Sequence, residues 1–124
     1  MSRATRLAMI APLIGASFLL APIPAVAGHG AAGLNLVNNS GQSISNLYIR
    51  RTGTQSWQPL PATPAKPTKG ARATSPFADP DCAFDIKVTL EDGKEAVWPG
   101  LNLCEVKSLT LNRNEAGLTW ADYD

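Results

Sequence analysis

The chain has 124 residues, of which 44% are hydrophobic and 17% charged, and its formal net charge at pH 7 is +1. This length fits one small domain, and so balanced a charge gives no sign of a nucleic-acid partner. A single histidine and two cysteines leave little material for nucleophilic catalysis or metal binding.

The N-terminal segment has the three parts of a secretory signal peptide. Arg3 and Arg6 precede the apolar stretch Leu7–Leu20, and Ala25 and Ala27 supply small residues for cleavage after Ala27. The apolar run is shorter than the ~20 residues of a bilayer-spanning helix, so an uncleaved anchor is the less favoured alternative. We therefore expect residues 1–27 to direct the protein to the periplasm or outside the cell, with no membrane span after cleavage.

The chain that follows predicts a leader and then a hairpin. Residues 28–33 are rich in glycine and alanine and are expected to form a flexible leader. Alternating apolar residues predict one strand from Leu34 to Val37 and a second from Ile44 to Thr52. Between them, Asn38–Gly41 reads Asn-Asn-Ser-Gly, four turn formers that predict a tight connection between paired strands.

Proline dominates the next segment, with six prolines between residues 59 and 80. Proline cannot donate a hydrogen bond to a β ladder. Residues 58–68 therefore predict an extended surface loop rather than regular structure. The loop is either a plain connection or a segment that docks into an aromatic groove. A short edge strand is expected between Lys69 and Ser75.

The clearest strand pattern lies between Cys82 and Leu90, where every second residue is apolar. The strand leads into Asp92-Gly93, a strong hairpin signal. A two-residue loop at Asp92-Gly93 pairs Val88 with Val97. In that register Val97 joins the core and Trp98 faces outward, and Pro99-Gly100 ends the strand.

A last strand is predicted from Leu103 to Leu111, with a β-bulge at Lys107-Ser108 where the apolar phase changes. Residues 112–124 are expected to form a tail or a short closing segment. Nowhere does a helical periodicity persist for three turns. Together the patterns predict an all-β domain over residues 34–124, a small antiparallel β-sandwich of five to six strands.

The two cysteines, Cys82 and Cys104, predict one disulfide, because an even count in an exported chain is typical of a structural bridge. A metal pair or a redox couple is the alternative. Neither fits the sequence well, since the two residues form no Cys-x-x-Cys motif and no histidine accompanies them.

Charge is distributed unevenly along the chain. Residues 28–76 hold five basic residues and no acid, whereas all ten acids lie between residues 77 and 124. We expect the two oppositely charged halves to pair across one compact fold. A bipolar surface that steers a charged partner is the alternative.

Taken in order, these residues resemble a group of short exported proteobacterial proteins. The group shares an opening Asn-Asn-(Ser/Thr)-Gly, then Ile-x-x-Leu-Tyr and a Trp, and a close of Cys-x-(Phe/Tyr)-Asp-(Ile/Leu), Asp-Gly and Leu-Cys. The resemblance covers most of residues 34–111 and implies export, a β fold and the Cys82–Cys104 pairing, but no activity. Residues 57–82 depart from it, since they are longer and richer in proline here. The matching residues are Asn38–Gly41, Ile44, Leu47, Tyr48, Trp57, Cys82–Ile86, Asp92, Gly93, Leu103 and Cys104.

Candidate metal ligands are few. His29 would be the second residue after cleavage, where the amine, an amide and the imidazole suit Cu(II), although an idle histidine in the leader is the simpler interpretation. Asp79, Asp81 and Asp85 surround Cys82, and oxygen clusters suit Ca²⁺. The calcium-loop motif is missing, so we predict no metal site and no cofactor. An ion pair with Lys87 or with a neighbouring strand, or the capping of a turn, better explains Asp85.

The aromatic residues give the best indication of a binding surface. Tyr48, Trp57 and Trp98 fall at outward or loop positions, and Arg50 lies on the same side of its strand as Tyr48. Exposed aromatic residues beside charge are typical of binding surfaces. The alternative is that Trp57 and Trp98 cover the second face of the sheet and complete the core.

These observations favour a non-catalytic binding or interaction module, and therefore not an enzyme, whose partner is an envelope protein or a small ligand. One alternative is a small Ca²⁺-dependent hydrolase built on Asp79, Asp81 and Asp85. The other is an envelope inhibitor or stress protein that acts through the proline-rich loop 58–68.

Overall fold

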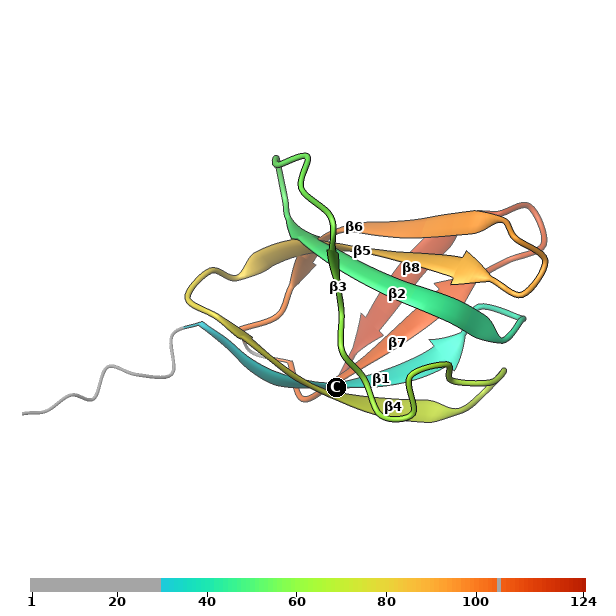
Figure 1. Cartoon of the computed structure of the whole chain (residues 1–124), viewed down its shortest axis with the longest axis horizontal. Helices are drawn as coiled ribbons and strands as arrows, with labels where there is room; N and C mark the ends of the chain where they lie inside the picture. The colour runs from blue at the N-terminus through green and yellow to red at the C-terminus, as the bar shows by residue number, and fades with distance from the viewer. Residues whose placement is uncertain (1–29, 105) are drawn as a thin grey trace, which may run out of the picture.

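The structure, a computed structural model, describes residues 30–104 and 106–124 and consists of two packed β-sheets without a helix in that part of the chain (Figure 1). The predicted signal peptide, residues 1–27, and His29 lie outside the described residues. Among the residues that are described, no helix has the length and apolar character to cross a membrane. The strands are β1 (Ala31–Asn39), β2 (Ile44–Arg51), β3 (Gln58–Pro59), β4 (Arg72–Asp79), β5 (Ala83–Leu90), β6 (Glu95–Asn102), β7 (Ser108–Arg113) and β8 (Thr119–Tyr123).

The first sheet has the order β4-β1-β7-β8 and the second the order β3-β2-β5-β6. Strands β1 and β7 run parallel, and the other pairings are antiparallel. The apolar core lies between the sheets, and most strands contribute a buried apolar side to it. The predicted all-β sandwich is confirmed, and the described residues form eight strands in place of the expected five to six. Its largest buried side chains are Trp98, Phe84, Ile44, Ile86, Leu90, Leu103, Leu109 and Leu111.

The expected hairpin between the first two strands is wrong, because β1 and β2 lie in different sheets. The buried side chain of Asn38 donates hydrogen bonds to the carbonyl oxygens of Gln42, Pro67 and Thr68. These bonds hold the Asn-Asn-Ser-Gly turn as a corner between the sheets. Strand β1 also begins at Ala31, which is 4% exposed, so the predicted leader 28–33 extends too far into the domain.

The proline-rich segment 58–68 is largely an exposed connection, as predicted, but it is anchored to the domain at a few points. Leu60 and Pro67 are buried, Thr63 exchanges backbone hydrogen bonds with Thr74 of β4, and Gln58–Pro59 form the short strand β3. The segment thus joins the edge of the second sheet to the edge of the first. The predicted edge strand at 69–75 is present as β4, shifted and longer.

The β5–β6 hairpin is present, but its predicted register is wrong. Leu90 N donates to Lys94 O, which leaves a three-residue loop that ends at Gly93 with φ of 88°, the usual geometry of a turn followed by a glycine bulge. Val88 therefore pairs with Ala96 and Ile86 with Trp98. Trp98 points into the core, with 1% of its surface exposed.

Strand β6 continues through Pro99-Gly100 to Asn102, and the register with β5 shifts there. Residues 103–107 then connect the two sheets, since β6 and β7 belong to different ones. The predicted continuous strand from Leu103 to Leu111 with a bulge is therefore wrong, since β7 begins at Ser108. The change of apolar phase at Lys107-Ser108 marks the end of the connection between the sheets. The expected closing segment is β8, which pairs with β7.

Candidate functional site

The outer face of the second sheet carries a group of aromatic and cationic side chains. Strand β2 turns Leu47 and Ile49 into the core, so Tyr48 and Arg50 face outward. On β5, Lys87 is the cross-strand partner of Tyr48 and shares that outward face. Trp57 immediately precedes β3, which pairs with β2. We call Tyr48, Arg50, Trp57 and Lys87 the aromatic–cationic cluster.

The four side chains of the cluster are in contact. Arg50 Cζ lies 4.2 Å from the centroid of the Trp57 ring, and Lys87 Nζ lies 4.7 Å from the same ring and 5.2 Å from that of Tyr48. These distances are those of cation–π contacts. All four residues are half-buried. The structure thus brings together three of the four predicted surface residues and places the fourth, Trp98, in the core.

Asp85 holds Arg50 in place through an ion pair. It is 3% exposed and accepts hydrogen bonds from Arg50 Nε at 2.9 Å, Thr52 Oγ1 at 2.8 Å and Gly100 N at 2.8 Å. The bulge at Pro99-Gly100 turns the Gly100 N–H toward the carboxylate. The predicted ion pair with a neighbouring strand is therefore confirmed, and its partner is Arg50 of β2. Lys87 lies instead 3.8 Å from Glu95 Oε2.

The environment of Asp85 lowers its pKa. Burial acts to raise the pKa of this carboxyl, but the hydrogen bonds from Gly100, Arg50 and Thr52 favour the ionised form and outweigh burial. Asp85 is therefore held as an anion beneath the cluster. Its hydrogen bonds keep Arg50 in place against Trp57.

Acidification should destabilise the fold through Asp85. Because the pKa of this carboxyl is lower in the folded state than in the unfolded state, it contributes stability above about pH 4 that is lost as the pH falls toward the folded-state value. We expect the free energy of unfolding, measured with urea between pH 6 and pH 2, to decline below about pH 4.

The matched variant for this experiment is Asp85→Asn, which removes the titrating group at nearly constant volume. It should be less stable at pH 6 and should show a shallower decline with acid. An identical pH dependence in the two proteins would contradict the role of Asp85.

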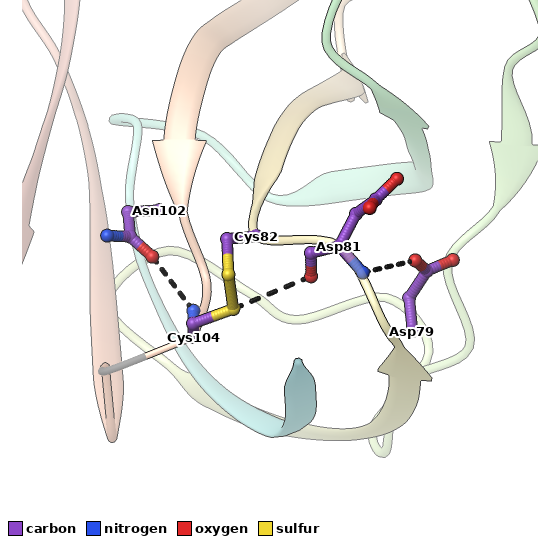
Figure 2. The surroundings of a disulfide bond; sticks show 5 residues. All are labelled: Asp79, Asp81, Cys82, Asn102 and Cys104. Atoms are coloured by element: carbon purple, nitrogen blue, oxygen red, sulfur yellow. Dashed lines mark hydrogen bonds between the residues drawn. A yellow bond between two sulfur atoms is a disulfide. The ribbon is translucent and has the colours of Figure 1, made fainter. Parts of the chain in front are cut away.

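Asp79 and Asp81 lie on the chain that leads into Cys82 and the disulfide (Figure 2). Arg51 Nη2 lies 3.0 Å from Asp79 Oδ1, and Arg51 Nε lies 2.9 Å from Asp81 Oδ2. The hydrogen bond from the backbone N–H of Asp81 is the main cause that lowers the pKa of Asp79, and the interaction with Arg51 lowers it further. The three aspartates considered as calcium ligands thus pair with two different arginines. Within the described residues, no group of three His, Cys, Asp or Glu side chains could hold a metal ion.

These ion pairs also account for the uneven charge of the sequence. Arg50 and Arg51 come from the basic half of the chain, and Asp79, Asp81 and Asp85 from the acidic half. The two halves therefore pair across the fold, as expected. Arg51 in addition joins β2 of the second sheet to β4 of the first.

A pocket of about 310 Å³ opens beside the cluster, between the edge of the second sheet and β4. We call it the edge pocket. Its apolar walls come from Ile49 and from Phe77 and Phe84, whose ring centroids are 5.1 Å apart in an edge-to-face arrangement. No local sequence pattern indicates this pocket, because Phe77 and Phe84 come from strands of different sheets. Its other lining residues are Arg50, Arg51, Thr54, Ser56, Gln58, Pro59 and Asp79.

Comparisons with known proteins give a fold but no family. No family model matches the chain, and no curated protein matches it significantly. A solved structure, the NMR structure of a protein from Eubacterium rectale, superimposes with a TM-score of 0.51 and 11% sequence identity, over 81% of this chain and 94% of that one. At this identity the similarity shows that the two chains share a fold.

Proposed function

We propose that this protein is an exported, non-catalytic binding module that holds a small amphiphilic ligand in the edge pocket, against the aromatic–cationic cluster. One observation carries the proposal. A concave site with apolar walls opens beside Arg50, a cation of the aromatic–cationic cluster that is already stacked on Trp57. Largely apolar pockets with a few fixed polar groups are the usual form of small-molecule sites.

The chemistry of the site limits the ligand. Ile49, Phe77 and Phe84 offer only apolar contacts to whatever enters the pocket. At the cluster, Asp85 and Glu95 balance the charges of Arg50 and Lys87, which disfavours a polyanion. The best match is a molecule with a flat apolar body and one acceptor group directed at the cations.

Export is part of the same proposal. The Cys82–Cys104 disulfide indicates an oxidising compartment outside the cytoplasm. The signal-peptide pattern of residues 1–27 supplies a route to it, to the periplasm or outside the cell. The ligand would then be a component of the cell envelope or of the medium.

The two alternative functions draw less support. A calcium-dependent hydrolase needs Asp79, Asp81 and Asp85 to converge, yet Arg51 holds the first two and Arg50 the third. An inhibitor acting through residues 58–68 needs that segment free to dock. Most of its residues are exposed, but the buried Leu60 and Pro67 and the backbone hydrogen bonds between Thr63 and Thr74 tie the segment to the domain.

The test uses 1-anilinonaphthalene-8-sulfonate, an aromatic anion with the required shape, and the chain from Gly28 onward. We expect saturable binding at one site, with amide chemical-shift changes at Ile49, Phe77 and Trp57. Trp57→Ala should weaken binding by about tenfold, since loss of one stacked aromatic contact of this kind is worth about 1 kcal/mol or more.

Trp120→Ala is the matched control, because Trp120 is exposed on the other sheet, and it should bind the probe like the parent protein. Equal weakening by the two variants, or shift changes away from the pocket, would show that the site is elsewhere. Absence of saturable binding up to about 1 mM, the weakest affinity worth assigning, would contradict the proposed function.

A further inference from the structure

The sandwich has four edge strands, β3 and β6 in the second sheet and β4 and β8 in the first. An unpaired strand edge presents free N–H and C=O groups that template pairing with another chain, and proteins commonly block such edges with proline. Three of the four edges here are blocked in this way. The fourth, β8, is not.

Strand β3 and the segment after it are blocked by Pro59 and Pro61. Leu60 N donates to Leu47 O, so Leu60 faces β2 and the two prolines on either side of it face away. On β4, the backbone of Thr74 faces away from β1 and is covered by Thr63. Two residues further along that strand lies Pro76.

Strand β6 is blocked in the same manner. Leu90 N donates to Lys94 O, so the backbone groups of Ala96 and Trp98, two and four residues further on, face β5. Those of Val97 and Pro99 are directed away from it. The carbonyl oxygen of Val97 is occupied, since it accepts a hydrogen bond from Thr119 Oγ1 at 2.7 Å.

Strand β8 has no proline between Thr119 and Tyr123. Asp124 and Ser108 exchange backbone hydrogen bonds, which sets the alternation along the strand. Trp120 and Asp122 therefore face β7, and the N–H and C=O groups of Ala121 and Tyr123 face outward. In the described part of the chain, no backbone group pairs with the outward N–H of Ala121 or Tyr123.

The exposed large apolar side chains of the described residues also lie at this edge. Leu118 is 66% exposed, Trp120 48% and Tyr123 49%, and all three belong to β8 or to the residue before it. Apolar side chains gathered beside an open strand edge mark an interaction surface rather than a solvated one.

We propose that β8 pairs with β8 of a second copy of this chain, antiparallel about a two-fold axis at Ala121. Pairing of an edge with its own copy closes after two subunits, which satisfies both edges and prevents further growth. The first sheets of the two copies then form one continuous eight-stranded sheet.

The sequence of β8 is self-complementary in that register. With Ala121 on the axis, Thr119 lies opposite Tyr123 of the second copy, a favourable β-branched and aromatic pair. Trp120 lies opposite Asp122 of the second copy. Asp122 of one copy therefore does not lie opposite Asp122 of the other. This register avoids opposed like charges, which would destabilise the strand pair.

Pairing at β8 leaves the proposed ligand site open. Strands β8 and β4 are the opposite edges of the first sheet, and the edge pocket lies at the β4 side. The dimer is therefore independent of the proposed function, and each is tested by a different measurement.

Sedimentation equilibrium of the chain from Gly28 onward, over a range of concentrations, tests the dimer. We expect a monomer–dimer equilibrium, together with concentration-dependent protection of the Ala121 amide from hydrogen exchange. Ala121→Pro should abolish the dimer, whereas Val97→Pro, at the already blocked edge of β6, should leave it intact.

Two substitutions at the exposed Trp120 test the register without relying on proline. Trp120→Asp places like charges opposite Asp122 of the second copy at two symmetric points and should weaken the dimer by about tenfold. Trp120→Lys places opposite charges there and should retain it. Equal effects of the two variants would overturn the register.

A monomer up to about 1 mM, the weak limit of specific association, would overturn the proposal. Binding of a foreign extended peptide at β8 by a chain that remains monomeric would overturn it as well, and would assign the edge to a different partner.

Discussion

Replacing Trp98 with alanine is expected to destabilise the fold by about 3–5 kcal/mol, the usual cost of deleting a buried Trp or Phe ring. The side chain is 1% exposed. Its Nε1 donates to the carbonyl oxygens of Asn112 and Trp120, each at 3.0 Å. Trp98 thus ties β6 of the second sheet to β7 and β8 of the first, and alanine would leave both a cavity and a lost connection between the sheets. Urea unfolding monitored by circular dichroism gives the free energy.

Two variants separate packing from hydrogen bonding in this result. Trp98→Phe keeps an aromatic ring but loses the N–H, so its cost should be lower than that of alanine. Trp120→Ala removes an exposed ring and should cost under about 1 kcal/mol. If Trp98→Ala cost no more than Trp120→Ala, the position of Trp98 at the centre of the sandwich would be contradicted.

The position of Trp98 also shows where sequence reasoning succeeds and where it fails. The alternation from Phe84 to Leu90 predicted β5 correctly, because a half-buried strand requires period two. Asp92-Gly93 correctly predicted a hairpin, but this dipeptide suits both a two-residue and a three-residue loop. A shift of one residue reverses every side chain of the strand, and that shift moves Trp98 from the surface into the core.

The candidate site was predictable to the extent that its residues lie on one strand. Tyr48 and Arg50 share a face because of strand alternation, and Trp57 joins them only because β3 pairs with β2. The period-two alternation of β5 places Lys87 on the polar side of that strand, and this signal could have added Lys87 to the predicted surface. The burial of Asp85 depends on a bulge at Gly100. This bulge was not predicted, because the local sequence Pro99-Gly100 is typical of the end of a strand.

Long-range pairing accounts for the other differences. Strand β1 pairs with β4 and β7, which lie far from it in sequence, while a turn signal such as Asn38–Gly41 reports only that the chain changes direction. The side chain that decides between a hairpin and a corner is Asn38. Its partners Pro67 and Thr68 lie in the segment that local patterns describe least well.

Removing the disulfide is the second change with a large expected effect. Cys82 and Cys104 are separated by 22 positions, and closing a loop of that size stabilises a fold by about 3 kcal/mol in the chain-entropy model. The double variant Cys82→Ala/Cys104→Ala should therefore unfold about 15 °C lower, since a domain of this size loses about 4–8 °C per kcal/mol. Differential scanning calorimetry measures the shift.

Reduction supplies the matched control for this variant. Dithiothreitol should lower the melting temperature of the parent protein toward that of the double variant and leave the double variant unchanged. A loss below about 1 kcal/mol would contradict the expectation and would mean that the ion pairs of Arg51 with Asp79 and Asp81 hold this end of the sandwich without the bridge. A loss of the expected size would make the fold dependent on an oxidising environment, because a domain this small has only about 5–15 kcal/mol of total stability.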